Sequence, residues 1–162
     1  MSVTNPETTA AMPRFPEELV GSTAFLLKRL GFAAKEQALR AYEESGLTPY
    51  HHAILVALDE DAHETQRSIA DALGYDRGQL VGLLDELEER DLIERRRDRD
   101  DRRRQIVEMT PAGKKALGRL RGLSRRLEDE LLTPLDPGEQ RMLHALLLRL
   151  AEHHLPHCAK AR

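Results

Sequence analysis

The sequence predicts a mainly α-helical fold, in which a winged helix-turn-helix with a small β-wing lies between N- and C-terminal helices. Three observations predict it. Residues 68–90 contain two short helical patterns separated by a turn, and residues 92–109 contain two strand-like segments that flank an arginine-rich loop. Long leucine-rich helical patterns lie on both sides of this region. The winged segment is therefore expected within a helical framework.

Composition favours a single helical domain without an intrachain disulfide or a membrane-spanning segment. The 162 residues include no Trp and 4% aromatic residues, so Leu and Ala must form the core. A single cysteine, Cys158, excludes an intrachain disulfide and fits a reducing compartment. The first residues show no signal-peptide pattern, and no apolar run approaches the length of a membrane span. We expect a cytoplasmic protein without a membrane partner.

The N-terminal third is expected to contain a polar tail and two helices. Residues 1–13 are predicted to be disordered, and one helix is expected from Pro16 to about Glu44. Its apolar residues are too numerous for the buried face of a lone monomer. Thr48 is expected to cap a second helix that begins with Pro49 and ends near Asp59.

The helix-turn-helix pair follows this second helix. Thr65 or a neighbour is expected to start the first helix of the pair, and Gly74 is expected to stop it. The second helix should begin at Asp76, which is predicted to form a capping box with Gln79. Its buried stripe follows the helical period and consists of Leu80, Leu83, Leu84 and Leu87.

The face opposite the leucine stripe of this second helix carries the residues that could contact DNA bases. It presents Gly78 and Gly82 with Arg77, Gln79 and Val81 on its flanks. Arg can bond to guanine and Gln to adenine with two parallel hydrogen bonds, and the two glycines suggest close backbone approach. An ordinary surface helix with two tolerated glycines is the alternative interpretation.

The arginine-rich loop connects two predicted wing strands, residues 92–96 and 105–109. Between Glu94 and Arg104 there are seven arginines and four acidic residues, although the whole chain has a net charge of -3. Such a local concentration of guanidinium groups is typical of a phosphate or minor-groove contact. The alternative is a solvated loop whose arginines pair with its own aspartates.

The C-terminal third is expected to form two helices and a tail. Thr110 and Pro111 should cap a long leucine-rich helix closed by Pro134, and the run from Asp136 to Glu139 should start a last helix that ends at Pro156. A single winged domain cannot cover so much apolar surface. An intertwined homodimer built from residues 16–44 and 111–155 is therefore predicted.

The chain also resembles the MarR family (multiple-antibiotic-resistance regulators) of bacterial transcription factors. The resemblance rests on Leu47-Thr48-Pro49, on Leu92-Ile93 with Arg95, and on Asp101-Arg102-Arg103 followed at family spacing by Thr110-Pro111-Ala112-Gly113. It covers about residues 19–155 and implies a single MarR-like domain over 14–155. Within it, 46–110 would be the winged helix-turn-helix and 14–45 and 111–155 the dimerisation helices, with 156–162 as a C-terminal tail.

The resemblance implies specific roles and a function. Asp101 would support the wing, and Arg103 would enter the minor groove. Many members have Ser-Thr at Gly78 and Gln79 and an Arg at Gly82, so this chain departs from the family at those positions. The family implies a homodimeric repressor of a pseudo-palindromic operator, released by a small aromatic or anionic ligand. A winged-helix protein-interaction module that does not bind DNA is the alternative.

The expected contacts with double-stranded DNA come from the second helix and the wing. The predicted DNA-binding residues are Arg77, Gly78, Gln79, Val81, Gly82, Arg95, Arg97, Arg99, Arg102 and Arg103.

Weaker patterns indicate other candidate sites. Arg40, Tyr50, His51 and His52 are candidate ligand-binding residues, although a structural role for His51 is the simpler interpretation. The C-terminal histidines together with Cys158 suggest a metal cluster, but Pro156 interrupts their helical alignment, so neither a metal nor another cofactor is expected. No catalytic motif is present, and an enzyme is not predicted.

Overall fold

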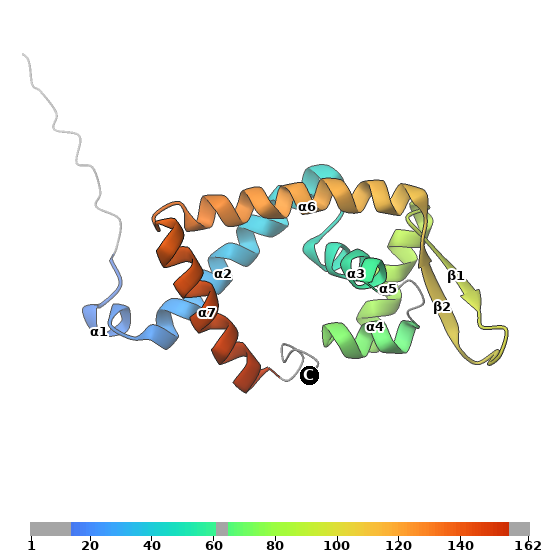
Figure 1. Ribbon diagram of the computed structural model, residues 1–162, viewed down its shortest axis with the longest axis horizontal. Coiled ribbons are helices and arrows are strands. Elements are labelled where there is room, and N and C mark those ends of the chain that lie inside the picture. Colours follow the sequence, from blue (N-terminus) through green and yellow to red (C-terminus); the bar gives the residue numbers. More distant parts are fainter. Residues whose placement is uncertain (1–13, 61–64, 156–162) are drawn as a thin grey trace, which may run out of the picture. The chain divides into compact units, whose positions relative to one another are not determined.

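The computed structural model describes residues 14–60 and 65–155, and it confirms the predicted mainly helical fold with a two-stranded wing (Figure 1). The chain divides into two compact units, residues 1–35 and 36–162. The predicted tails at 1–13 and 156–162 lie outside the described residues, as do most of the short loop expected after the second helix and the proposed helix stop at Pro156. None of the described helices is both long and apolar enough to cross a bilayer.

The predicted continuous helix from Pro16 to Glu44 is wrong in its continuity. The structure has a short helix α1 (Glu17–Val20), a break at Gly21 and Ser22, and then α2 (Thr23–Tyr42). The break arises because Ser22 Oγ accepts a hydrogen bond from Phe25 N at 3.3 Å, which starts a new helix. A 3-10 turn, η1 (Glu43–Ser45), then leads to Gly46 in the left-handed region at φ 66°.

The core of the second unit is made by four helices and the base of the wing. Helices α3 (Pro49–Glu60), α4 (Gln66–Leu73), α5 (Arg77–Glu89) and α6 (Pro111–Leu132) contribute fully or almost fully buried side chains. Ile54, Leu55, Ile69, Leu84 and Leu87 are completely buried, and three of them belong to the predicted helix-turn-helix stripes. Burial of these faces fixes which sides of α4 and α5 point outward.

The wing is an antiparallel pair of strands, β1 (Ile93–Arg97) and β2 (Gln105–Met109), in which Arg95 pairs with Val107. An isolated bridge between Thr65 and Ile106 joins the start of α4 to β2. Between α5 and β1, Asp91 adopts the left-handed conformation, with a φ of 56°. The wing is thus joined to the start of α4 by the bridge and to the end of α5 by the turn at Asp91.

Helix starts follow the predicted capping residues with one exception. Thr65 forms a capping box with Ser68, and Asp136 forms one with Glu139 at the start of α7 (Pro137–His154). Asp76 Oδ1 accepts from Gly78 N and Gln79 N, but no reciprocal bond from the Gln79 side chain is present. The capping box predicted for Asp76 and Gln79 is therefore wrong in its second half, which leaves the Gln79 amide on the surface.

Helix α7 keeps an apolar stripe on its surface within the second unit. None of its described residues is buried, and Met142, Leu146 and Leu150 are 62%, 44% and 47% exposed. In the first unit, Arg29 lies over the exposed rings of Phe15 and Phe32, 5.0 and 6.0 Å from their centroids. The uncovered apolar stripe of α7 is large for a monomer surface.

Gly113 should be intolerant of any side chain, because it seats the first turn of α6 on the base of the wing. A Cβ there would lie 2.1 Å from Leu92 O and 2.7 Å from Met109 Cγ. We predict that Gly113→Ala costs about 1–3 kcal/mol in free energy of unfolding, measured by urea denaturation. Gly118→Ala is the matched control, because nothing lies within 4 Å of its Cβ position, and it should instead stabilise α6 by about 1 kcal/mol.

Candidate nucleic-acid interface

The outward face of α5 presents the residues that the sequence analysis predicted. Arg77, Gly78, Gln79, Val81 and Gly82 are all exposed, since the leucine stripe points inward, with Leu83 half-buried and its other three residues buried. A Cβ at Gly82 would meet nothing within 4 Å, so no intramolecular packing requires glycine there. Gly78 differs, because a Cβ at that position would stand 3.1 Å from the capping Asp76 Oδ1. The open surface at Gly82 leaves the α5 backbone accessible to a partner.

The arginines of the wing divide into paired and unpaired groups. Arg95 and Arg96 are bonded to carboxylates, and Arg103 Nε lies 3.5 Å from Asp101 Oδ1. Arg97, Arg99, Arg102 and Arg104 are exposed and form no salt bridge with any described residue. The alternative in which the loop arginines pair with their own aspartates therefore accounts for only a minority of these side chains.

Asp101 organises the tip of the wing. Its Oδ1 accepts a hydrogen bond from Arg103 N at 3.0 Å, and its carbonyl oxygen accepts one from Arg104 N at 2.8 Å. Asp98 N in turn donates to Arg104 O at 3.0 Å, which closes the loop. The Arg103 side chain is 95% exposed, so the turn presents its guanidinium to the solvent. These are the contacts that a wing-supporting residue would make.

Arg95 occupies a different position from the one expected of a DNA-contacting residue. Its Nε donates to Glu88 Oε2 at 3.0 Å, its Nη2 contacts both Glu88 and Asp85, and its backbone N–H donates to Glu88 Oε1 at 3.0 Å. The side chain is only 18% exposed. Arg95 therefore ties β1 of the wing to the C-terminal half of α5, and the DNA-binding role predicted for it remains a prediction.

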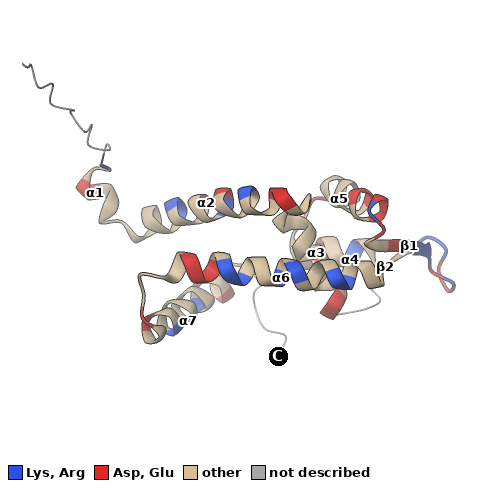
Figure 2. Ribbon diagram, turned by 90° about the horizontal axis from the view of Figure 1, so that it is seen from above, with Lys and Arg blue, Asp and Glu red and all other residues tan. Residues whose placement is uncertain are grey.

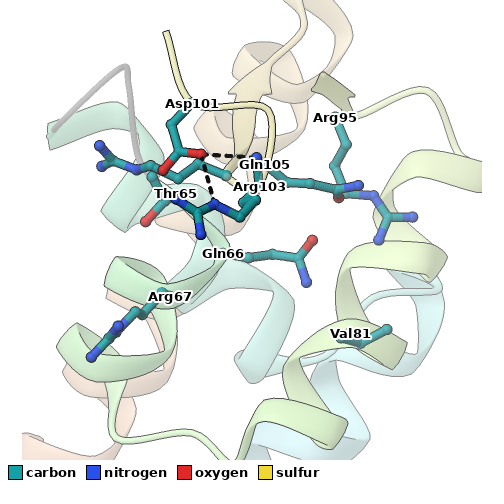
Figure 3. Close-up of a pocket in the computed structure, with 9 residues that line it drawn as sticks. Thr65, Gln66, Arg67, Val81, Arg95, Asp101, Arg103 and Gln105 are labelled. Carbon is teal, nitrogen blue, oxygen red and sulfur yellow. Dashed lines mark hydrogen bonds and ion pairs between the residues drawn. The ribbon is translucent and has the colours of Figure 1, made fainter. Parts of the chain in front are cut away.

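A groove of about 800 Å³ lies between the helix-turn-helix and the wing (Figure 3). The first residues of α4 and its cap line one side, Val81 of α5 lines another, and Arg95, Asp101 and Arg103 come from the wing. The residues predicted from the sequence lack Arg104 and Gln105 of the wing, and they also lack Thr65, Gln66 and Arg67 of α4 and its cap. The sequence feature that could have indicated the last three is the cap Thr65 followed by Gln66 and Arg67 in the first turn of α4. Backbone N–H groups at a helix N-terminus favour the binding of anions such as phosphate.

The charge distribution around this groove is uneven. Figure 2 shows basic residues on the loop beyond β1 and β2 and acidic residues on α5. Asp85 and Glu88, the acids on the wing side of α5, are engaged by Arg95. The Arg95 hydrogen bond holds the pKa of Glu88 below its ordinary value, and the same bond raises the pKa of Arg95. Arg95 thereby offsets one of the two negative charges nearest the wing, and the exposed Arg103 and Arg104 contribute positive charge to the wing side of the groove.

The four ligand candidates lie around the start of α3 and at the end of α2. His51 is 1% exposed, and its Nδ1 accepts from Thr48 N at 3.0 Å, which places the ring proton on Nε2. Nε2 lies 3.0 Å from Glu86 Oε2 without the alignment of a hydrogen bond. Burial lowers the pKa of His51, Arg90 lowers it further and Glu86 opposes the shift, so the ring stays neutral near pH 7. These contacts favour a structural role for His51.

The other three candidates have different neighbours. His52 Nδ1 lies 2.7 Å from the hydroxyl of Tyr42, and burial lowers the pKa of His52. The ring of Tyr50 stands edge-on to that of Tyr75, with centroids 5.8 Å apart, whereas Arg40 is exposed on α2. A ligand-binding role for the four residues stays a prediction.

The metal cluster suggested by the C-terminal histidines is only partly described. His153 and His154 stack edge to face with ring centroids 4.7 Å apart. No group of three potential metal ligands comes together within residues 14–60 and 65–155. His157 and Cys158 lie outside the described residues.

Comparison with known proteins relates this interface to DNA-binding regulators. A family model described as the MarR family matches residues 45–104. The putative transcriptional regulatory protein for the hcr operon of Thauera aromatica is 32% identical over 133 residues, which cover 82% of this chain and 80% of that protein. The winged segment and most of its helical framework thus share their sequence pattern with a regulator.

Solved structures share the fold as well. The transcriptional repressor CouR, bound to a 23-mer DNA duplex, is 32% identical with a TM-score of 0.77, over 86% of this chain and 99% of CouR. The PcaV transcriptional regulator of Streptomyces coelicolor, in complex with its natural ligand, is 26% identical with a TM-score of 0.69, over 87% of this chain and 98% of PcaV.

The bond between Glu88 and Arg95 should make the attachment of the wing pH-dependent. Because the pKa of Glu88 is lowered in the folded protein, its stabilising effect is present above the ordinary value of 4.5 and is lost as the pH falls through the folded pKa. We predict that Glu88→Gln unfolds at lower urea than the wild type at pH 7, and that this difference shrinks below pH 4.5. Glu89→Gln, an exposed neighbour, should show no such pH-dependent difference; an equal loss in both variants would contradict the assignment.

Proposed function

Since this chain belongs to the MarR family of transcriptional regulators, a family of DNA-binding proteins and not of enzymes, we propose that it is a sequence-specific repressor. In this proposal a homodimer binds a pseudo-palindromic operator, and a small molecule releases it. The observation that carries the proposal is the pairing of an exposed α5 N-terminal face with a cationic wing across one groove. A duplex can be contacted by both elements at once, with phosphates between them.

Sequence selection is assigned to the N-terminal half of α5. Arg77 and the unbonded side chain of Gln79 are the two exposed groups there that can read base edges. The exposed wing arginines Arg97, Arg99, Arg102 and Arg103 supply affinity for phosphates and for the minor groove. We assign Arg95 a positioning role, because its guanidinium is occupied by Glu88 and Asp85.

A homodimer is supported by the uncovered apolar stripe of α7. Soluble monomers rarely expose such a contiguous stripe, and a second copy of the same helix is a self-complementary cover. Two recognition helices related by a two-fold axis would then read half-sites about 10 bp apart. Release by a small molecule is supported by the likeness to PcaV, which was solved with its natural ligand.

The protein-interaction alternative would use the acidic part of α5 against a basic partner. Two of those acids, Asp85 and Glu88, already bind Arg95 within the chain. Their engagement favours DNA over a basic protein as the partner of this face.

Binding to a DNA fragment that contains the intergenic region upstream of the protein's own gene tests the proposal. If each subunit neutralises about four phosphates, the slope of log K against log salt should be near -7. Arg103→Ala should weaken binding to all sequences and make the slope shallower by about 1 per subunit, or about 2 per dimer. Arg125→Ala, an exposed arginine on α6 outside the groove, should change neither value.

Gln79→Ala is the complementary variant, and its binding to the same DNA fragment and to base-substituted fragments is measured by fluorescence anisotropy. It should alter base preference at nearly constant salt slope, because an amide that reads a base edge neutralises no phosphate. A uniform loss across all sequences would contradict the role given to Gln79. Failure of the wild type to distinguish this fragment from random DNA would contradict the proposed function itself.

The dimer is tested by placing a charge within the apolar stripe of α7. Leu146→Glu should give a monomer in sedimentation equilibrium, since a buried unpaired carboxylate at the interface is costly. His144→Glu introduces the same charge on the opposite side of the helix and should leave the dimer intact. A monomeric wild type, or equal effects of both substitutions, would argue against the α7 interface.

A further inference from the structure

Val81 is an apolar residue in an otherwise polar groove. Every other described residue that lines the groove between the helix-turn-helix and the wing is polar or charged. Figure 3 shows Val81 on the α5 side of this groove, with Gln66 and Arg67 on the α4 side. The same three side chains also line a neighbouring pocket of about 280 Å³, together with Arg77 and Leu80. Val81 thus borders Arg77 in one pocket and the wing in the other.

The exposure of Val81 is not explained by dimerisation. Val81 is 39% exposed, and the other exposed large apolar residues that the structure describes lie in residues 15–32 and 131–155. Those residues are in or beside the segments predicted to form the dimer, whereas α5 is not. A lone exposed valine on an ordinary helix surface requires no explanation. Val81 differs because it lies inside the candidate nucleic-acid interface.

The residues around Val81 leave its methyl groups accessible. On a helix surface, the neighbours of position 81 are positions 77, 78, 84 and 85. Gly78 has no side chain, Leu84 is completely buried, and Asp85 is bound to β1 of the wing. The surface beside Val81 is also open at Gly82, since a Cβ there would meet nothing within 4 Å. A flat partner can therefore reach the valine side chain directly.

The chemistry of Val81 matches one feature of duplex DNA. In the major groove, the C5-methyl group of thymine is the apolar group that base edges present, and the other groups there are hydrogen-bond donors and acceptors. Phosphates are anionic and gain nothing from contact with a valine. Arg77 and Gln79 can bond to the donors and acceptors, and Val81 can contact only the methyl group. An apolar contact of this kind distinguishes thymine from a pyrimidine that lacks the C5-methyl group.

We infer that Val81 is a specificity-determining residue, which contacts the C5-methyl group of a thymine in each half-site. This inference rests on the proposed function, because it requires that α5 enters the major groove. The contact removes about one methyl group from water, which corresponds to a change of about fourfold in affinity for each half-site. Val81 thus adds an apolar contact to the hydrogen bonds assigned to Arg77 and Gln79.

Replacement of thymine by uracil tests the inference. The full-length wild type is first used to select its preferred sequence from a pool of random duplexes. Each thymine of that sequence is then replaced in turn by deoxyuridine, which pairs with adenine in the same way and lacks only the C5-methyl group. At one position in each half-site, the replacement should weaken binding by the wild type about fourfold, measured by fluorescence anisotropy.

Three variants assign this uracil penalty to Val81. Val81→Ala should bind the thymine duplex more weakly than the wild type does, and it should no longer distinguish thymine from uracil at that position. Val81→Ile keeps a branched apolar side chain and should keep the penalty. Arg103→Ala is the matched control: it should weaken binding to both duplexes by the same factor, because its exposed guanidinium reads no methyl group.

A merely structural role for Val81 predicts a different result. In that case Val81→Ala would unfold at lower urea and would bind both duplexes more weakly by one factor. Equal binding of the thymine and uracil duplexes by the wild type at every position would overturn the inference. A uracil penalty that Val81→Ala retains in full would also overturn it, as would a selected sequence without thymine.

The selection step separates this inference from the proposed function. If the wild type selects no sequence from the random pool, the proposed function fails and the inference fails with it. If the wild type selects a sequence and shows no uracil penalty, the proposed function stands and the role given to Val81 is wrong.

Discussion

The contact on which the interface depends is the bond between Arg95 and the acidic side chains of α5. A two-stranded wing has little buried area of its own, so its direction must be fixed by its neighbours. Arg95 bonds to Glu88 through its backbone N–H and through its guanidinium, and it also reaches Asp85. Two Nη2 contacts, one Nε bond and one backbone bond hold β1 at a set distance from α5. The separation of the reading helix from the wing, and hence the width of the groove, follows from this contact.

The same contact resolves an electrostatic problem of the sequence. A recognition helix with several acids in its C-terminal half would be repelled by phosphates. Asp85 and Glu88 share the guanidinium of Arg95, which offsets part of their charge within the chain. These acids therefore serve to hold β1 against α5, and Arg97, Arg99, Arg102 and Arg104 of the wing form no salt bridge with any described residue. An acidic protein can bind an anionic polymer because its charges are sorted in this way.

Short-range patterns predicted most of the fold, and contacts between distant residues account for what they missed. The Leu80 to Leu87 stripe and the Thr110-Pro111 start determine α5 and α6, because the relevant bonds span only a few residues. The break at Gly21 was missed because Ser22 caps a helix only when the chain turns there. The bonds of Arg95 to Asp85 and Glu88 were not predicted, because these partners lie seven or more positions away and only the angle of β1 brings them together. Gln66 and Arg67 were missed for the same reason, since the wing completes their groove.

Gly46, before α3, and Gly82, on the outward face of α5, are glycines for different reasons. Gly46 is favoured by the chain itself, because its left-handed conformation, with a φ of 66°, strains any residue that carries a Cβ. Gly82 has no such internal requirement, although a helix interior disfavours glycine by about 1 kcal/mol relative to alanine. A residue that costs stability and relieves no internal crowding is best explained by an external partner that approaches the helix closely. Gly46 thus serves the turn between η1 and α3, and Gly82 serves the exposed surface of α5.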